Sequence, residues 1–294
     1  MDQMQWKILT DVIRQAMKGM PRFRRFRFGD FLIVAMYFWA VKHDRAMMWA
    51  CDRNNYSSLF RPRKLPSISQ FHRRIKSPRV QAILQRINDL LAERSKQRAC
   101  LIVDGKPLLV SNVSKDRDAR KGYVVGGFGK GYKLHAFLSL GGEFVCWCVR
   151  PLNEHEMPIA TQMLEQFPPL PSDGLLLADG NYDAHDFHKA VFARGGQLVC
   201  PLRGKATHPV TLRQMGEARR ELIKLSDTSP NLVEADLRQR RRIETRFGNL
   251  TTMGLGPLPY FVRRLPRVRR WTGAKIALYH IRNKARKMLA QQKD

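Results

Sequence analysis

The sequence predicts an α/β protein, in which an all-helical N-terminal domain precedes a mixed five-stranded sheet with flanking helices. Three observations support this fold class. Apolar residues in the first ninety-odd positions recur at helical spacing. From Cys100 onward the pattern changes to strands, and later helix and strand patterns alternate, which is typical of a sheet covered by helices. We therefore expect a helical domain at 1–96 and a sheet domain at 97–294, with the boundary near Lys96.

The N-terminal domain is predicted to hold several helices. The first is indicated by apolar residues at helical spacing that end before Pro21: Leu9, Val12, Ile13, Ala16, Met17 and Met20. The apolar run from Phe31 to Val41 is about half the length needed to cross a bilayer, so we interpret it as a buried helix. Ser77 and Pro78 form an N-cap and first-turn pair for a further helix with one apolar face.

A short basic helix is expected just before Ser77. It carries Arg73 and Arg74, and the serines that precede it can cap its first turn. Its tight connection to the next helix is compatible with a helix-turn-helix that places the basic helix on DNA. An ordinary solvated helix in a bundle explains the same pattern equally well.

The strand region begins at Cys100 with three strands, of which the second and third are joined by a turn at Gly141 and Gly142. Helix, strand, helix and strand then follow, and a last helix packs an apolar stripe on the sheet. The stretches are 101–110, 132–140, 143–151, 157–167, 174–182, 184–196, 197–203 and 236–250. A meander followed by alternating elements implies a mixed sheet with helices on its faces.

The C-terminal stretch contains no acidic residue between Leu250 and Lys293. Its cations are expected to form a basic surface: Arg263, Arg264, Arg267, Arg269, Arg270, Lys275, Arg282, Lys284, Arg286 and Lys287. Helical spacing of Leu278, Ile281 and Ala285 predicts that this basic tail is ordered.

Composition limits the function. The net charge of +28, from 53 Lys and Arg against 25 Asp and Glu, indicates a polyanionic partner, and nucleic acid is the natural candidate. A hydrophobic content of 44% excludes a disordered basic tail. Five irregularly spaced cysteines and an opening without a basic secretory leader favour a soluble protein of a reducing cytoplasm, with no membrane association. The glycines at 126–131 match no nucleotide-binding fingerprint, so no nucleotide cofactor is expected.

Three carboxylates stand out. Asp104 interrupts an apolar strand, Asp179 closes the apolar run of a later strand, and Glu244 lies at the edge of the apolar stripe of the last helix. A buried carboxylate needs a counter-charge, a metal or an exposed strand end. If the two strands are neighbours, the three acids can converge on one site. Carboxylates without His or Cys suit Mg²⁺.

Each acid also has a plain structural explanation. Asp104 can open a turn before Gly105, Asp179 can form a turn, and Glu244 can pair with Arg240 one helical turn away. Together, in a chain poor in acids, these explanations carry less weight.

Other polar residues suggest sites that we set aside. His185 and His188, with Asp183 nearby, resemble half of a zinc site, but polar residues on a helix surface explain them more simply. Cys146, Cys148 and Cys200 lack paired metal-ligand spacing, so we expect buried thiols.

Five stretches in order resemble the catalytic domain of DDE transposases of bacterial insertion sequences, which share an RNase H-like fold: VDGKPL, GYKLHAF, PLNEHE, LLLADGNYDA and RQRRRIETRFGNL. The resemblance covers roughly residues 98–255. It implies a catalytic and metal-binding triad of Asp104, Asp179 and Glu244, with two Mg²⁺ ions for which Mn²⁺ can substitute. It further implies a nucleoid-associated endonuclease that cleaves DNA at terminal inverted repeats, transfers the strand to target DNA, and works as a homodimer on DNA.

Around the glutamate, the related enzymes carry a tyrosine, arginine, glutamate and lysine signature. Arg240 and Glu244 fit it, whereas the tyrosine and lysine positions hold Leu237 and Thr251. The DNA-end contacts of the missing tyrosine and lysine can be made instead by Arg241, Arg246 or the basic tail.

Lys133 and His135 are two residues apart on a predicted strand, so their side chains point to the same face. There they either contact DNA or belong to a solvated surface. Two other functions stay open. One is a catalytically lapsed, transposase-derived DNA-binding protein, and the other is an RNA-directed nuclease on the same fold.

Overall fold

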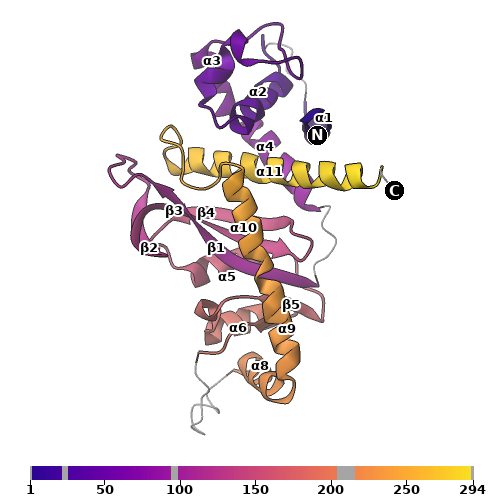
Figure 1. Cartoon of the computed structure of the whole chain (residues 1–294), viewed down its shortest axis with the longest axis vertical. Coiled ribbons are helices and arrows are strands. Elements are labelled where there is room, and N and C mark those ends of the chain that lie inside the picture. The colour runs from indigo at the N-terminus through magenta and orange to yellow at the C-terminus, as the bar shows by residue number, and fades with distance from the viewer. Residues whose placement is uncertain (1, 22–25, 94–98, 204–215, 293–294) are drawn as a thin grey trace. The chain divides into compact units, whose positions relative to one another are not determined.

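The computed structural model describes residues 2–21, 26–93, 99–203 and 216–292 (Figure 1). The chain divides into two compact units. The helical unit comprises Met1–Arg94 and Met253–Asp294, and the sheet unit comprises Ser95–Thr252. The boundary that the sequence predicts near Lys96 lies outside the described residues. At the other end the structure differs from the predicted division, because the C-terminal segment packs with the N-terminal helices.

The helical unit is built from five α-helices and two short 3₁₀ turns among the described residues. Their bounds are α1 Asp2–Met17, α2 Asp30–Lys42, η1 Met47–Cys51, η2 Arg53–Asn55, α3 Ile68–Ile75, α4 Pro78–Glu93 and α11 Leu265–Ala290. Ten of the thirteen residues of α2 are buried, which confirms that the apolar run is a core helix. Within the described ranges, no helix combines the length and the apolarity that crossing a membrane requires.

Helix α11 is a central element of the helical unit, in contact with α1, α2 and α4. All residues from Trp271 to Ile281 are buried, including Lys275, whose exposed fraction is 1%. The Lys275 ammonium lies 2.6 Å from Asp44 Oδ1 and donates to the Met253 carbonyl, because a buried charge needs such partners. The predicted basic surface is therefore wrong at Lys275, while Arg263 and Arg286 are exposed as expected.

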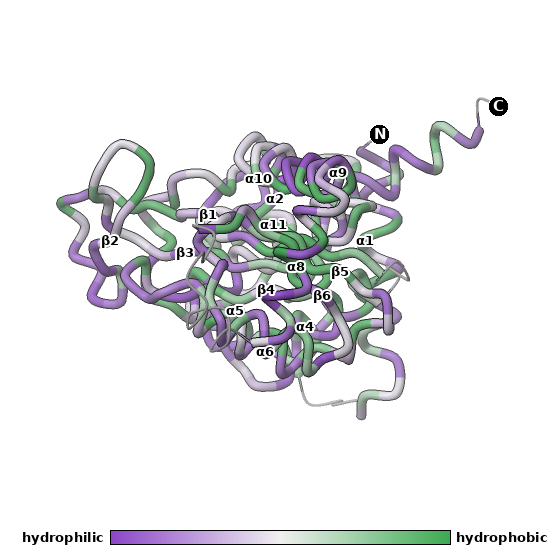
Figure 2. The backbone as a smooth tube through the Cα atoms, turned by 90° about the horizontal axis from the view of Figure 1, so that it is seen from below, coloured by the Kyte–Doolittle hydropathy of each residue, from purple (hydrophilic) through white to green (hydrophobic). Residues whose placement is uncertain are grey.

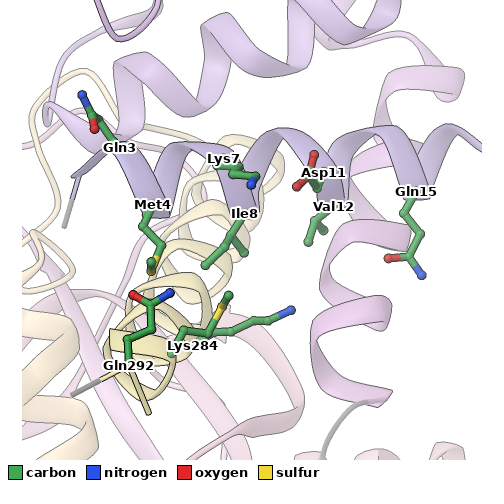
Figure 3. Close-up of a pocket in the computed structure, with 10 residues that line it drawn as sticks. Gln3, Met4, Lys7, Ile8, Asp11, Val12, Gln15, Lys284 and Gln292 are labelled. Atoms are coloured by element: carbon green, nitrogen blue, oxygen red, sulfur yellow. The ribbon is translucent and has the colours of Figure 1, made fainter. Parts of the chain in front are cut away.

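A pocket of about 470 Å³ lies between α1 and the end of α11 (Figure 3). Its lining is mainly long polar and apolar side chains, among them Lys7, Ile8 and Lys284. The one carboxylate of the lining, Asp11, pairs with Arg14 at 2.9 Å. The pocket therefore holds no pair of acids for catalysis or metal binding.

The sheet unit contains a mixed sheet whose strand order is β2-β3-β1-β5-β6, with β4 also pairing with β3. The bounds are β1 Cys100–Val110, β2 Arg120–Val124, β3 Gly127–Ser139, β4 Phe144–Pro151, β5 Gly174–Leu177 and β6 Gly196–Val199. Strands β2 and β4 pair with successive stretches of β3, on its edge away from β1. The sheet thus has six strands, one more than the five that the sequence predicts, because β2 is an addition.

Helices cover both faces of this sheet. They are α5 Glu156–Gln166, α6 His185–Ala193, α8 Glu217–Thr228, α9 Pro230–Arg240 and α10 Arg242–Thr252, with a short turn η3 Gly180–Tyr182. Figure 2 shows α9 and α10 on one side of the strands and α5 and α6 on the other. This arrangement confirms the predicted fold class, a mixed α/β sheet with flanking helices after a helical N-terminal region.

The last two helices of the sheet unit carry Arg240 and Glu244. The predicted helix at 236–250 is two helices that meet at Arg241. Ile243, Phe247 and Leu250 are buried, as their spacing predicts, and the Phe247 ring stacks on Phe144 of β4. Helix α10 is thereby fixed over the sheet with its polar edge beside β1.

Candidate active site

Asp104 and Asp179 come from neighbouring strands. Strands β1 and β5 pair in parallel, with Ile102 opposite Leu177. The same register, continued by two residues, brings Asp104 level with Asp179 just beyond the carboxyl end of β5. Ligands of open α/β sheets bind at this end of the strands. The expectation that the two strands are neighbours is confirmed.

The Asp104 carboxylate is held in an unfavourable electrostatic position. Its pKa is raised from 3.8 to about 7, first by burial and further by the carboxylates of Asp179 and Glu156. A hydrogen bond of 2.7 Å from the Gly105 amide and the positive charge of Arg240 only partly oppose this rise. A divalent cation at this position would remove the remaining repulsion.

Glu244 reaches the site through Arg240. The Arg240 guanidinium lies 3.1 Å from Glu244 Oε1 and 3.8 Å from Asp104 Oδ2. The side chain of Glu244 is 61% exposed. Among the described residues, Asp104, Asp179 and Glu244 do not form a group whose ligand atoms all lie within 4.8 Å of one another. The structure therefore aligns the two aspartates and connects the glutamate to them by an arginine.

Sequence reasoning missed Glu156, which lies in the first turn of α5. Its Oε1 is 2.6 Å from Lys133 Nζ, and it lies 3.0 Å from the point where a Cβ at Gly105 would stand. The carboxylate therefore lies against β1 at the residue that follows Asp104. The motif PLNEHE contained the signal, since an acid at a helix start is stabilised there.

Lys106 was missed as well. Its Nζ donates a 2.7 Å hydrogen bond to Thr251 Oγ1 on α10. By the resemblance noted above, Thr251 holds the position of a signature lysine, and the Lys106 ammonium group from β1 lies beside that position. Burial lowers the pKa of Lys106. Alternation along β1 puts Lys106 on the same sheet face as Asp104.

The predicted DNA contact at His135 does not fit the structure. His135 has no exposed surface, and its two ring nitrogens have no hydrogen-bond partner among the described residues. Burial lowers its pKa to about 4, so the ring is neutral. The reason is that α5 covers this face of β3. Lys133, on the same face, is largely buried in its ion pair with Glu156.

The other predicted DNA contacts differ in exposure. Arg74 is mostly buried and forms an ion pair with Asp30, so it holds the helical unit together instead of reaching outward. Arg73 and Arg241 are exposed. Arg246 is half-buried beside the glycine turn between β3 and β4. Of this set, Arg73 and Arg241 are placed best for contact with a partner.

Comparison with known proteins assigns the chain to a family. The family model described as Transposase DDE domain matches residues 95–279, more than half of the chain. The chain belongs to this family. No curated protein matches it.

Two solved structures resemble this DDE transposase at low similarity. One is a pre-cleavage Mos1 transpososome, with 12% identity, coverage of 82% of this chain and 83% of that chain, and a TM-score of 0.24. The other is a Mos1 transposase paired-end complex with the left transposon end, with 10% identity, coverage of 78% and 87%, and a TM-score of 0.24. At these TM-scores the likeness adds nothing to the family assignment.

DDE transposases generally use divalent metal ions, and the site of this family member fits such an ion. Asp104 and Asp179 offer hard oxygen ligands at one level of the sheet. Tyr182 is buried beside them, and burial together with the carboxylates of Glu156, Asp104 and Asp179 raises the pKa of its hydroxyl. Asp179 accepts hydrogen bonds of 2.8 and 3.2 Å from Asn181, and Asp104 is only partly neutralised by Arg240. A hydrated cation would neutralise the remaining negative charge of this pair.

A second polar group of this transposase lies at the carboxyl end of β6. Asp183, His188 and Cys200 have ligand atoms within 4.8 Å of one another, and all three side chains are buried. His188 is thus not the helix-surface residue that the sequence predicts. Arg219 donates two hydrogen bonds to Asp183, at 2.7 and 2.8 Å. Although burial opposes it, hydrogen bonding lowers the pKa of Asp183 to about 2. This ion pair anchors α8 to the sheet unit.

Proposed function

We propose that this protein is a metal-dependent DNA transposase that cleaves DNA at the terminal inverted repeats of its element and transfers the strand to target DNA. The observation that carries the proposal is the alignment of Asp104 with Asp179 on adjacent strands, with Glu244 connected through Arg240. Family membership supports the reaction class, and the net charge of +28 suits a DNA substrate.

Asp104, Asp179 and Glu244 are the residues that would hold the metal, which we take to be two Mg²⁺ ions with Mn²⁺ as a substitute. When bound, such ions activate the attacking oxygen and stabilise the leaving oxygen of the phosphodiester. The remaining work of the protein is positioning and neutralisation of charge.

Arg240 has two partners in this scheme. In the structure it supplies the positive charge between Asp104 and Glu244. If the carboxylates were neutralised by metal, the Arg240 guanidinium would be available for a DNA phosphate, for which its forked donors are suited. Lys106 and Arg241 extend the same cationic edge along β1 and α10.

The helical unit is proposed to bind DNA through the exposed face of α3, which carries Arg73. Only two residues separate α3 from α4, and this short turn is compatible with a helix-turn-helix whose first helix crosses the DNA backbone. The sheet unit is proposed to perform the chemistry. Because transposition joins two element ends, we expect a homodimer on DNA.

The proposal is tested with DNA that carries the inverted repeats flanking the gene. Asp104→Asn is expected to abolish Mg²⁺-dependent cleavage while DNA binding, measured by mobility shift, stays within twofold of wild type. Asp173→Asn, which changes an exposed acid of the sheet unit, is the matched control and keeps cleavage.

The enzyme proposal is refuted if the wild-type protein binds the element ends and never cleaves them with Mg²⁺ or Mn²⁺. That result would favour a second candidate, a catalytically lapsed DNA-binding protein. Leu237 and Thr251 at the signature positions favour that candidate. Cleavage of an RNA–DNA hybrid in place of duplex DNA would instead identify the RNA-directed nuclease.

A further inference from the structure

The tip of the β2–β3 hairpin exposes a cluster of apolar side chains. Tyr123 and Phe128 are 75% and 65% exposed, and their ring centroids lie 4.1 Å apart. Val125 is fully exposed at the turn, where Gly126 and Gly127 adopt positive φ. Figure 2 shows the hairpin at one end of the sheet unit, beyond the helices that cover the strands. Two aromatic rings held together in solvent indicate an interaction site.

Lysines share the face of the hairpin that carries the rings. Tyr123 is opposite Phe128, and Lys121 is opposite Lys130. Because alternate residues of a strand point to the same side, the four side chains form one row of two cations and two rings. Lys130 is fixed by donating to the Ser114 carbonyl at 2.6 Å, whereas Lys121 is exposed.

The opposite face of the hairpin is packed against the body of the sheet unit. A Cβ at Gly122 would stand 2.6 Å from the Leu152 carbonyl oxygen, and one at Gly129 would stand 2.8 Å from the Leu109 side chain. Gly122 therefore requires glycine, because a larger residue would clash with backbone, whereas at Gly129 the end of the Leu109 side chain can move aside. The aromatic and cationic row is held facing away from the core.

The row lies on the same sheet face as the candidate active site. Asp104 pairs with Ala136 of β3, and Phe128 and Lys130 are at even spacing from Ala136 along that strand. Phe128 and Ala136 are eight positions apart along β3, which corresponds to about 26 Å at the usual strand rise. A duplex with its scissile phosphate at Asp104 would reach the hairpin roughly eight base pairs away.

We propose that the Tyr123 and Phe128 face of the β2–β3 hairpin binds DNA by stacking on an unpaired or unstacked base, while Lys121 contacts the adjacent phosphate. The inference rests on the proposed function and adds a contact that the reaction chemistry does not require. Stacking of bases on aromatic side chains beside cations is the general mode by which proteins hold single-stranded DNA. Further exposed cations in the preceding stretch, Lys115, Arg117 and Arg120, make a nucleic acid the matching partner.

The first experiment measures binding of the full chain to a fluorescent single-stranded 20-mer and to the same sequence as a duplex. The double variant Tyr123→Ala with Phe128→Ala is expected to weaken single-strand binding about tenfold, with less effect on the duplex. The slope of log affinity against log salt stays unchanged, because no charge is removed. Lys121→Ala, in contrast, flattens that slope by about 0.7. Phe192→Ala, which removes another half-exposed ring of the sheet unit, is the control.

A second experiment uses the wild-type chain alone. The same 20-mer, carrying 5-iodouracil at successive positions, is irradiated, and the cross-linked peptide is identified by mass spectrometry. A cross-link within residues 120–131 supports the inference. Unchanged single-strand affinity of the double variant, or cross-links confined to other segments, overturns it and leaves the transposase proposal standing. A wild-type chain that binds no DNA overturns both.

Discussion

Replacing Asp104 by asparagine should stabilise the metal-free protein, and the gain should depend on pH. Burial and neighbouring carboxylates raise the pKa of Asp104 from 3.8 to about 7 in the folded state. The folded state therefore binds a proton more tightly than the unfolded state, so stability falls as pH rises between these two values. Asparagine is similar in shape and carries no charge, so it escapes this loss.

The size of the effect follows from the shift. About three pKa units correspond to an upper limit of about 4 kcal/mol at pH 8, where the carboxylate is ionised in both states. At pH 5 the stability difference between Asp104→Asn and wild type shrinks to about 2 kcal/mol, because Asp104 is then protonated in the folded state. For a unit of this size, 1 kcal/mol moves the unfolding temperature by about 2–4 °C.

The assay is thermal unfolding in chelator at pH 5 and pH 8, followed by circular dichroism. Asp104→Asn should raise the unfolding temperature at both values and clearly more at pH 8, while Asp173→Asn, at an exposed position, should change neither. Mg²⁺ should then raise the unfolding temperature of wild type and leave that of Asp104→Asn unchanged, because a ligand stabilises only a folded state that binds it. Equal gains at the two pH values, or no gain at pH 8, would refute the assigned electrostatics.

Three further outcomes are expected. Arg219→Leu leaves the Asp183 carboxylate buried without its charge partner, so urea denaturation should show a loss of about 3–5 kcal/mol; a loss below 1 kcal/mol would mean that the ion pair does not anchor α8. Arg240→Gln removes the cation between Asp104 and the glutamate, so Mg²⁺ should raise the unfolding temperature more than in wild type; an unchanged response would exclude competition between guanidinium and metal. Lys106→Met should lower the cleavage rate about tenfold with metal-induced stabilisation intact, and a normal rate would remove Lys106 from the DNA contact.

The acid pair could be predicted because strand patterns place it. An aspartate inside the apolar run of β1 and another at the end of β5 are visible in the sequence, and parallel neighbours bring such positions level. The position of Glu244 relative to the two aspartates was harder to predict. Helical spacing correctly predicted the Arg240 and Glu244 pair, yet no local pattern reveals that the arginine also reaches Asp104 on another element.

Burial of polar residues was the main error of sequence reasoning. Lys275 looks like one more cation of a basic stretch, because its partner Asp44 is far away in the chain. His135 alternates out of a strand as a surface residue would, but strand alternation says nothing about which helix covers that face. In both cases the deciding contact is long-range, so composition and periodicity could not supply it.

The order of the two units along the chain also bears on biosynthesis. Helices α1 to α4 leave the ribosome before the sheet unit, and α11, which contacts α1, α2 and α4, leaves it after the sheet unit. A nascent chain interrupted after Thr252 would contain every acid of the site and still lack the core of its N-terminal bundle. The proposed DNA-binding unit is therefore assembled only after the sheet unit has been synthesised, so a polypeptide interrupted at that point would carry the acids of the site without a complete DNA-binding unit.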